Sequence, residues 1–79
     1  MLDSEIVGKV FQHFRERKGL SQEVVSGLAG IGRTHLSAIE RGERRPTLDT
    51  LFKLANALSI APSDIIREIE REIEKTEMK

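Results

Sequence analysis

Two short stretches with helical periodicity, separated by a glycine turn, constrain this chain more than any other feature of its sequence. Residues 22–29 and 33–40 each carry apolar side chains at helical spacing, and Ser21 is a good N-cap for the first stretch. Only residues 30–32 lie between them, which leaves room for a very short turn. Gly30 stands where such a turn requires a positive φ, which costs a residue with a Cβ. The pattern predicts two short helices joined at a tight corner.

These two helices have the features of a helix-turn-helix motif. Small and apolar residues occupy the positions that lie between the helices. They are Val25, Ser26, Ala29, Ile31, Leu36 and Ile39. Val24 and Leu28 are also expected to face inward, since they share the periodicity of the first stretch. A generic pair of helices would not need all of these residues at once, so the pattern favours this motif.

Helical signals cover the rest of the chain as well, and there is no alternating strand pattern. A helix is expected over 5–18, capped by one of the two polar residues before it. Thr47 is expected to cap a fourth helix, and Pro62 suits the first position of a fifth that continues to about residue 76. The buried stripe of the fourth helix is expected to contain Leu48, Leu51, Leu54, Ala55 and Leu58. The chain is therefore predicted to be all-α, a compact five-helix domain with an extended C-terminal helix.

The composition limits what can hold such a small domain together. A chain of 79 residues buries only about 60% of the surface that it exposes when unfolded. It has no cysteine for disulfides or a thiolate zinc site, and with three Phe and no Trp or Tyr its core must be mainly aliphatic. No stretch of apolar residues is long enough for a transmembrane helix, and the N-terminal residues lack the apolar core of a signal peptide. A cytoplasmic protein without a membrane partner is expected.

Charge is distributed unevenly, although the formal net charge is zero. Residues 9–53 contain nine basic and five acidic side chains, a net charge of +4, whereas residues 59–79 carry a net charge of −2. A basic body with an acidic tail fits a protein with one electropositive face. An ordinary mixed surface would have the same composition, so charge alone does not decide between these interpretations.

The chain resembles the lambda-repressor-like helix-turn-helix family, also called the xenobiotic-response-element type. The matching runs are Leu20-Ser-Gln-Glu, Leu28-Ala-Gly-Ile, Arg33-Thr-His-Leu-Ser-Ala-Ile-Glu-Arg-Gly42 and Arg45-Pro-Thr-Leu. The resemblance covers roughly residues 7–66. Within the family, the short length is similar to that of restriction–modification controller proteins and small phage-type repressors. The resemblance implies a sequence-specific transcriptional regulator that binds double-stranded DNA.

The same resemblance implies that the third helix enters the DNA major groove. Residues that match the base-reading positions of the family are Arg33, Thr34 and Ser37. The guanidinium group of Arg33 can bond guanine O6 and N7, and Thr34 offers a hydroxyl and a methyl group. Gly32 departs from the family pattern, because a Ser or Thr often caps the recognition helix at this position.

A second group of residues is expected to contact the DNA backbone. It consists of Gln22, His35, Arg41, Arg44 and Arg45. Gln22 matches a phosphate-binding position of the family, and its backbone N–H lies at a helix start, which also favours phosphate. The arginines have a second interpretation as part of a solvated loop, in which Arg41 pairs with Glu40 or Glu43.

The last helix carries an isoleucine stripe that continues beyond the usual end of the family's domain. The stripe consists of Ile65, Ile66, Ile69 and Ile73. Charged residues flank the stripe, as they do at the interface between two paired helices. Since repressors of this type also bind two half-sites, we expect a homodimer on an inverted repeat. Residues 1–66 are then the DNA-binding domain and residues 67–79 a dimerisation element. Alternatively, the stripe packs onto the chain's own first helix, beside Phe11 or Phe14.

No arrangement of residues points to catalysis or to a cofactor. His13 and His35 lie in separate helices without a cysteine partner, which is a poor basis for a metal site. There is no nucleophile–base arrangement and no phosphate-cradling glycine loop. Neither an enzyme nor a small-molecule ligand is expected. The alternative function is a protein-interaction or antitoxin-type module with the same fold.

Overall fold

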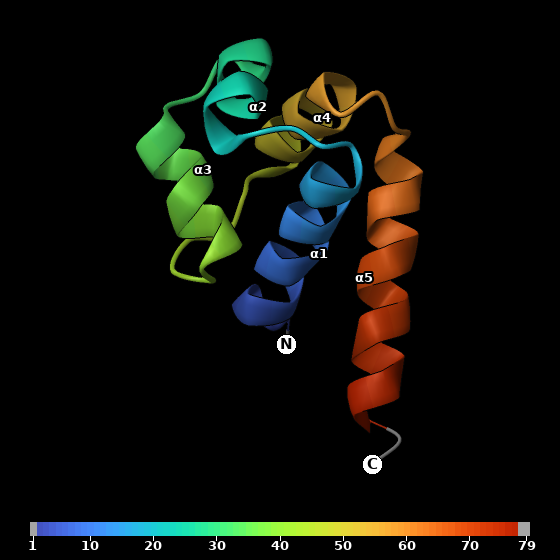
Figure 1. Cartoon of the computed structure of the whole chain (residues 1–79). Helices are drawn as coiled ribbons and strands as arrows, with labels where there is room; N and C mark the ends of the chain where they lie inside the picture. Colours follow the sequence, from blue (N-terminus) through green and yellow to red (C-terminus); the bar gives the residue numbers. More distant parts are fainter. Residues whose placement is uncertain (1, 78–79) are drawn as a thin grey trace.

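The computed structural model describes residues 2–77 and contains five α-helices over that range, with no strand. The helices are α1 (Ser4–Arg17), α2 (Gln22–Ala29), α3 (Arg33–Glu40), α4 (Leu48–Ala57) and α5 (Pro62–Glu77). α1 contacts both α3 and α5 and lies between them in Figure 1, so that α3 and α5 are on opposite sides of the molecule. The predicted all-α fold is confirmed, with an extended last helix.

Polar side chains determine where most of the helices begin. Asp3, Ser21 and Thr47 each accept a hydrogen bond from a backbone N–H of the first turn, at 2.9, 3.1 and 3.1 Å. Each bond satisfies an N–H group that has no partner within its helix. α3 differs, because its N-cap is Gly32 and no side chain caps it. The first N–H groups of α3 are therefore left without a side-chain acceptor.

A single apolar core lies between the helices, and every helix contributes to it. Its buried side chains are Val7, Val10, Phe11, Val25, Ala29, Leu36, Ile39, Leu51, Leu54, Ala55, Leu58, Ile65 and Ile69. α2 packs on α3 and α4, and α5 packs on α1 and α4. The helix-turn-helix pair is thus fixed to a scaffold made by the other three helices.

Three apolar residues that were expected inside are exposed. Val24 and Leu28 precede the buried Val25 and Ala29 by one position. One position is a rotation of about 100° around a helix, which turns both side chains away from the core. Leu48, in the first turn of α4, is also exposed. The prediction of burial is therefore wrong for these three residues.

The isoleucine stripe of α5 mostly belongs to the chain's own core. Ile65 is 0% exposed and Ile69 is 7% exposed, because α5 packs along α1 and α4. Both residues are therefore corrected from dimer contacts to core residues, and only Ile69 keeps a small accessible surface beside Ile66 and Ile73. Ile73 packs partly against the core, and Ile66 remains 48% exposed. The core thus extends to Ile69, past the expected domain boundary at 66.

The rest of α5 continues without a break to Glu77. The expected dimerisation element, residues 67–79, is helical up to that point, and its last two residues lie outside the described part. Within residues 2–77, no helix is both long and apolar enough to cross a membrane.

Gly8 lies where α1 passes the end of α3. A Cβ atom at this position would collide with the backbone carbonyl groups of Ile39 and Glu40. Only glycine permits the two helices to approach this closely. Gly8 therefore helps to set the position of α3 on the scaffold.

Candidate nucleic-acid interface

The turn between α2 and α3 has the geometry that its sequence predicts. Gly30 adopts a left-handed conformation, with φ 72° and ψ 30°. The N–H of Ile31 then donates to the carbonyl oxygen of Ser26 at 3.0 Å, which closes the end of α2. Leu36 and Ile39 are buried, so α3 is held by one face while its opposite face is left to solvent.

Arg33 and Thr34 lie at the start of this solvent-facing side of α3. Both are exposed, and neither side chain has a hydrogen-bond or ion-pair partner within residues 2–77. Their donors and acceptors are therefore available to a ligand. A guanidinium group in this state can form the two parallel hydrogen bonds that guanine offers in the major groove.

Ser37 lies on the same face of α3, but its side chain is already engaged. Its Oγ is bonded to the guanidinium group of Arg41. Arg41 also donates from Nε and Nη2 to the two carboxylate oxygens of Glu43, at 2.9 and 3.0 Å. Of the two partners that the sequence left open for Arg41, the structure selects Glu43. These hydrogen bonds lower the pKa of Glu43 and raise that of Arg41.

A buried ion pair behind α3 was not predicted from the sequence. Glu40 accepts from Arg15 Nε at 2.7 Å and from Arg15 Nη2 at 3.0 Å. Arg15 Nη1 donates to the carbonyl oxygen of Leu20 at 2.7 Å. The hydrogen bonds to Glu40 raise the pKa of Arg15. The two residues are 25 positions apart, and no local spacing signals their contact.

The Gln22 side chain also belongs to this buried network. Its Nε2 donates to Glu40 at 2.9 Å, so that Glu40 joins α1, α2 and α3. The side chain is thus directed to Glu40, whereas the Gln22 backbone N–H is at the first position of α2 and has no acceptor within the helix. The group that remains for a phosphate is the backbone N–H.

The other expected backbone contacts differ in how freely they can bind. Arg44 is exposed and its side chain has no partner within residues 2–77, and His35 is half-buried. Arg45 donates to Ser4 Oγ at 2.8 Å and to the Leu2 carbonyl oxygen at 3.0 Å. Arg45 therefore anchors the loop after α3 to the start of α1. Among these three residues, Arg44 is the side chain best placed to reach a phosphate.

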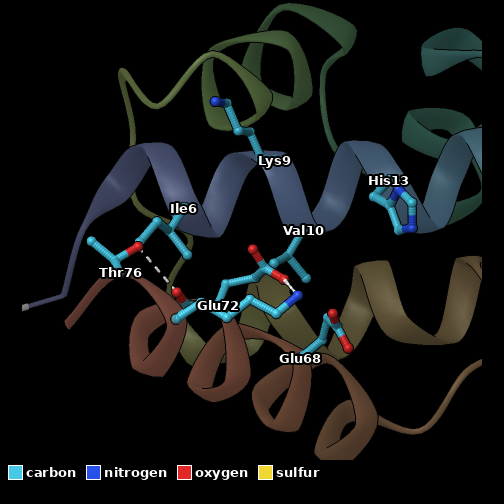
Figure 2. Close-up of a pocket in the computed structure, with 8 residues that line it drawn as sticks. Ile6, Lys9, Val10, His13, Glu68, Glu72 and Thr76 are labelled. Atoms are coloured by element: carbon cyan, nitrogen blue, oxygen red, sulfur yellow. Dashed lines mark hydrogen bonds and ion pairs between the residues drawn. The ribbon is translucent and has the colours of Figure 1, made fainter. Parts of the chain in front are cut away.

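A hollow of about 550 Å³ lies between α1 and α5, away from the exposed face of α3 (Figure 2). Ile6 and Val10 contribute its apolar lining, and Glu72 pairs with Lys75 at 3.1 Å. Within residues 2–77, no group of three potential ligands is suited to a metal ion. His13 also lines the hollow, together with Lys9, Glu68 and Thr76.

Comparisons with known proteins agree with this geometry. A family model described as helix-turn-helix, HTH_3, matches residues 12–65. The uncharacterized HTH-type transcriptional regulator y4dJ of Sinorhizobium fredii is 40% identical over 62 residues, which cover 78% of this chain and 80% of that protein. The control protein C.SmaI of Serratia marcescens is 40% identical over 55 residues, or 70% of this chain and 66% of its own.

Solved structures give the same picture. The restriction–modification controller protein C.AhdI from Aeromonas hydrophila superposes with a TM-score of 0.76 at 38% identity, covering 87% of this chain and 98% of that one. The resemblance to small controller proteins that the sequence suggested is thereby confirmed.

Proposed function

We propose that this chain, which belongs to the helix-turn-helix family HTH_3, acts as a homodimer on an inverted repeat in DNA. Its relatives make it a sequence-specific DNA-binding transcriptional regulator. In this proposal each subunit places α3 in a major groove. Half-site centres then lie about one helical turn, or roughly 34–36 Å, apart.

The observation that carries the proposal is the state of the exposed face of α3. Arg33 and Thr34 present unpaired polar groups at the start of a helix whose opposite face is locked into the core. Such a rigid helix with free donors at its N-terminal end suits the reading of base edges. We assign base reading to Arg33 and Thr34, and to Ser37 once its hydroxyl is released.

Phosphate contacts would then come from the two ends of the motif. The backbone N–H of Gln22 lies at the start of α2, where the helix dipole and unpaired N–H groups favour an anion. Arg44 lies in the loop after α3, and its side chain is free to bind a phosphate of either DNA strand. His35 stays a candidate for a weaker contact.

The dimer contact is proposed for the exposed side of α5. Ile66 and Ile73 line a shallow hollow of about 430 Å³ together with Leu2 and the buried Ile69, and the rest of its lining is Glu70, Glu74 and Glu77. An exposed isoleucine beside such a hollow suits burial against a second copy of the same face. The variant Ile66→Glu should sediment as a monomer with an unchanged helical circular dichroism spectrum. A variant that still sediments as a dimer would place the interface elsewhere.

Selection from a random duplex library with the full-length protein tests the function itself. Enrichment of an inverted repeat supports dimeric, sequence-specific binding and gives the operator. No enrichment, even at low salt where phosphate contacts are strongest, would favour a protein-interaction or antitoxin-type module instead.

The variant Arg33→Ala tests the assignment of base reading. We expect it to weaken binding to the selected duplex by about 1–3 kcal/mol and to relax specificity at one base pair per half-site. Arg71→Ala is the matched control, since it removes the same charge from an exposed ion pair on α5. Unchanged specificity in Arg33→Ala would remove this residue from the readout.

A further inference from the structure

The end of α3 holds a charged cluster made of Ser37, Arg41 and Glu43. The Arg41 guanidinium group bonds both oxygens of the Glu43 carboxylate and the hydroxyl of Ser37 at the same time. Two of these three residues are expected to contact DNA, and the third is an acid. In the free protein, the acid thus occupies the group that would otherwise bind a phosphate.

The backbone places Glu43 beside Arg41. Arg41 is the C-cap of α3, and Gly42 follows with φ 79° in the left-handed region. The N–H of Gly42 donates to the Ile39 carbonyl oxygen at 3.0 Å, and that of Glu43 to the Ala38 carbonyl oxygen at 2.9 Å. These bonds form a Schellman motif, which turns the chain back over the last turn of the helix.

The turn is also held from outside. A Cβ atom on Gly42 would collide with the backbone of Glu5 in α1, so the chain is packed closely here. The position of Glu43 is therefore set by the fold, and its side chain returns to Arg41 without a long flexible loop.

A carboxylate and a phosphate each offer an arginine two oxygens, which the planar guanidinium group can bond through two parallel N–H groups. The Arg41–Glu43 pair is exposed, with 53% and 60% of the two side chains accessible, and exposed pairs of this kind are weak. A DNA phosphate, backed by the charge of the duplex, can therefore replace Glu43. Release of Arg41 also frees the Ser37 hydroxyl, which lies on the base-reading face.

We propose that Glu43 is an internal competitor that holds Arg41 against Ser37 until a DNA phosphate displaces it. This inference rests on the proposed DNA-binding function and identifies Glu43 as a residue that weakens DNA binding. Glu43 lowers the affinity for all DNA, and the Ser37 hydroxyl recovers the acceptor site that Arg41 occupies when Arg41 moves to a phosphate. Glu43 is thus a positioning residue that sets the affinity and salt dependence of binding.

The test measures the affinity of full-length Glu43→Gln for the selected duplex by fluorescence anisotropy over a range of salt concentrations. We expect binding about three- to fivefold tighter than that of the wild type, since the energy of a weak exposed ion pair is recovered. The slope of log K against log salt should steepen by up to about one unit, because Arg41 then neutralises a phosphate without leaving an acid behind.

Glu68→Gln is the matched control. Glu68 also forms an ion pair with an exposed arginine, Arg71, but on α5, on the other side of α1 from α3, and its own side chain is 28% exposed. Its removal changes the net charge equally and should change the affinity by less than half as much. Equal effects of the two variants would overturn the proposal, because net charge alone would then explain the gain.

Repeating Glu43→Gln in an Arg41→Ala background separates competition from simple repulsion. If Glu43 competes for Arg41, the gain in affinity becomes smaller when Arg41 is absent. If Glu43 only repels phosphates, the gain is as large or larger, and the proposal is wrong. If the selection with the wild-type protein enriches no duplex, the proposed function is overturned, and this inference with it.

Discussion

Two arginine–glutamate pairs meet at the end of α3, through the consecutive residues Glu40 and Arg41. Arg15 and Glu40 are 12% and 3% exposed in their side chains, whereas Arg41 and Glu43 are 53% and 60% exposed. Both pairs use two parallel hydrogen bonds between a guanidinium group and a carboxylate. The chemistry is the same, and only the surroundings differ.

Burial determines what each pair can do. The groups of the inner pair have left water and depend on their partners, so the pair ties α1, α2 and α3 into one rigid unit. The groups of the outer pair are hydrated and lose little when they separate. The inner pair thus positions α3, and the outer pair can be exchanged for a ligand. Substitutions that distinguish stability from DNA affinity test this difference.

The largest effect is expected for Glu40→Ala. It leaves the charge of Arg15 mostly buried without its partner, which typically costs about 3–5 kcal/mol. In such a small domain this is a large part of the whole free energy of unfolding. Urea denaturation followed by circular dichroism measures the loss. A change below about 1 kcal/mol would show that the inner pair does not hold the helices together.

Arg41→Ala should behave in the opposite way. We expect its free energy of unfolding to stay within about 0.5 kcal/mol of the wild type, as for other exposed substitutions. Its binding to the selected duplex should weaken, and the salt slope should shrink by about one unit. Loss of stability comparable to that of Glu40→Ala, measured in the same urea experiment, would remove the distinction between the pairs.

The smallest effect concerns the protonation of Glu43. The hydrogen bonds from Arg41 lower the pKa of Glu43 below its ordinary value of 4.5. The stabilising contribution of this carboxylate is therefore present above pH 4.5 and is lost as the pH falls through the lowered value. Side-chain carboxyl NMR should show the lowered pKa in the wild type and a return toward 4.5 in Arg41→Ala. An identical pKa in both proteins would mean that the outer pair does not form in solution.

The sequence predicts most of the fold because its signals are local. The caps at Ser21 and Thr47 and the turn at Gly30 each depend on a few neighbouring residues. The exposed positions of Arg33 and Thr34 follow from the same periodicity, since Leu36 and Ile39 define the buried face of α3. Whether these residues contact bases stays a prediction.

Features that depend on distant contacts escaped sequence reasoning. Glu40 meets Arg15 only after α1 and α3 have packed, and Gly8 is required only at their crossing. The apolar stripe of α5 indicated burial correctly, but periodicity does not tell whether the chain's own core or a second subunit covers it. Ile65 and Ile69 were therefore assigned to a dimer, although they pack inside the monomer.

The most direct measurement is a crystal structure of the full-length protein bound to the selected duplex. The account predicts α3 in the major groove, with Arg33 and Thr34 at base edges and the Arg41 guanidinium group on a phosphate, separated from Glu43. A complex in which α3 lies outside the groove, and another surface contacts the DNA, would contradict it.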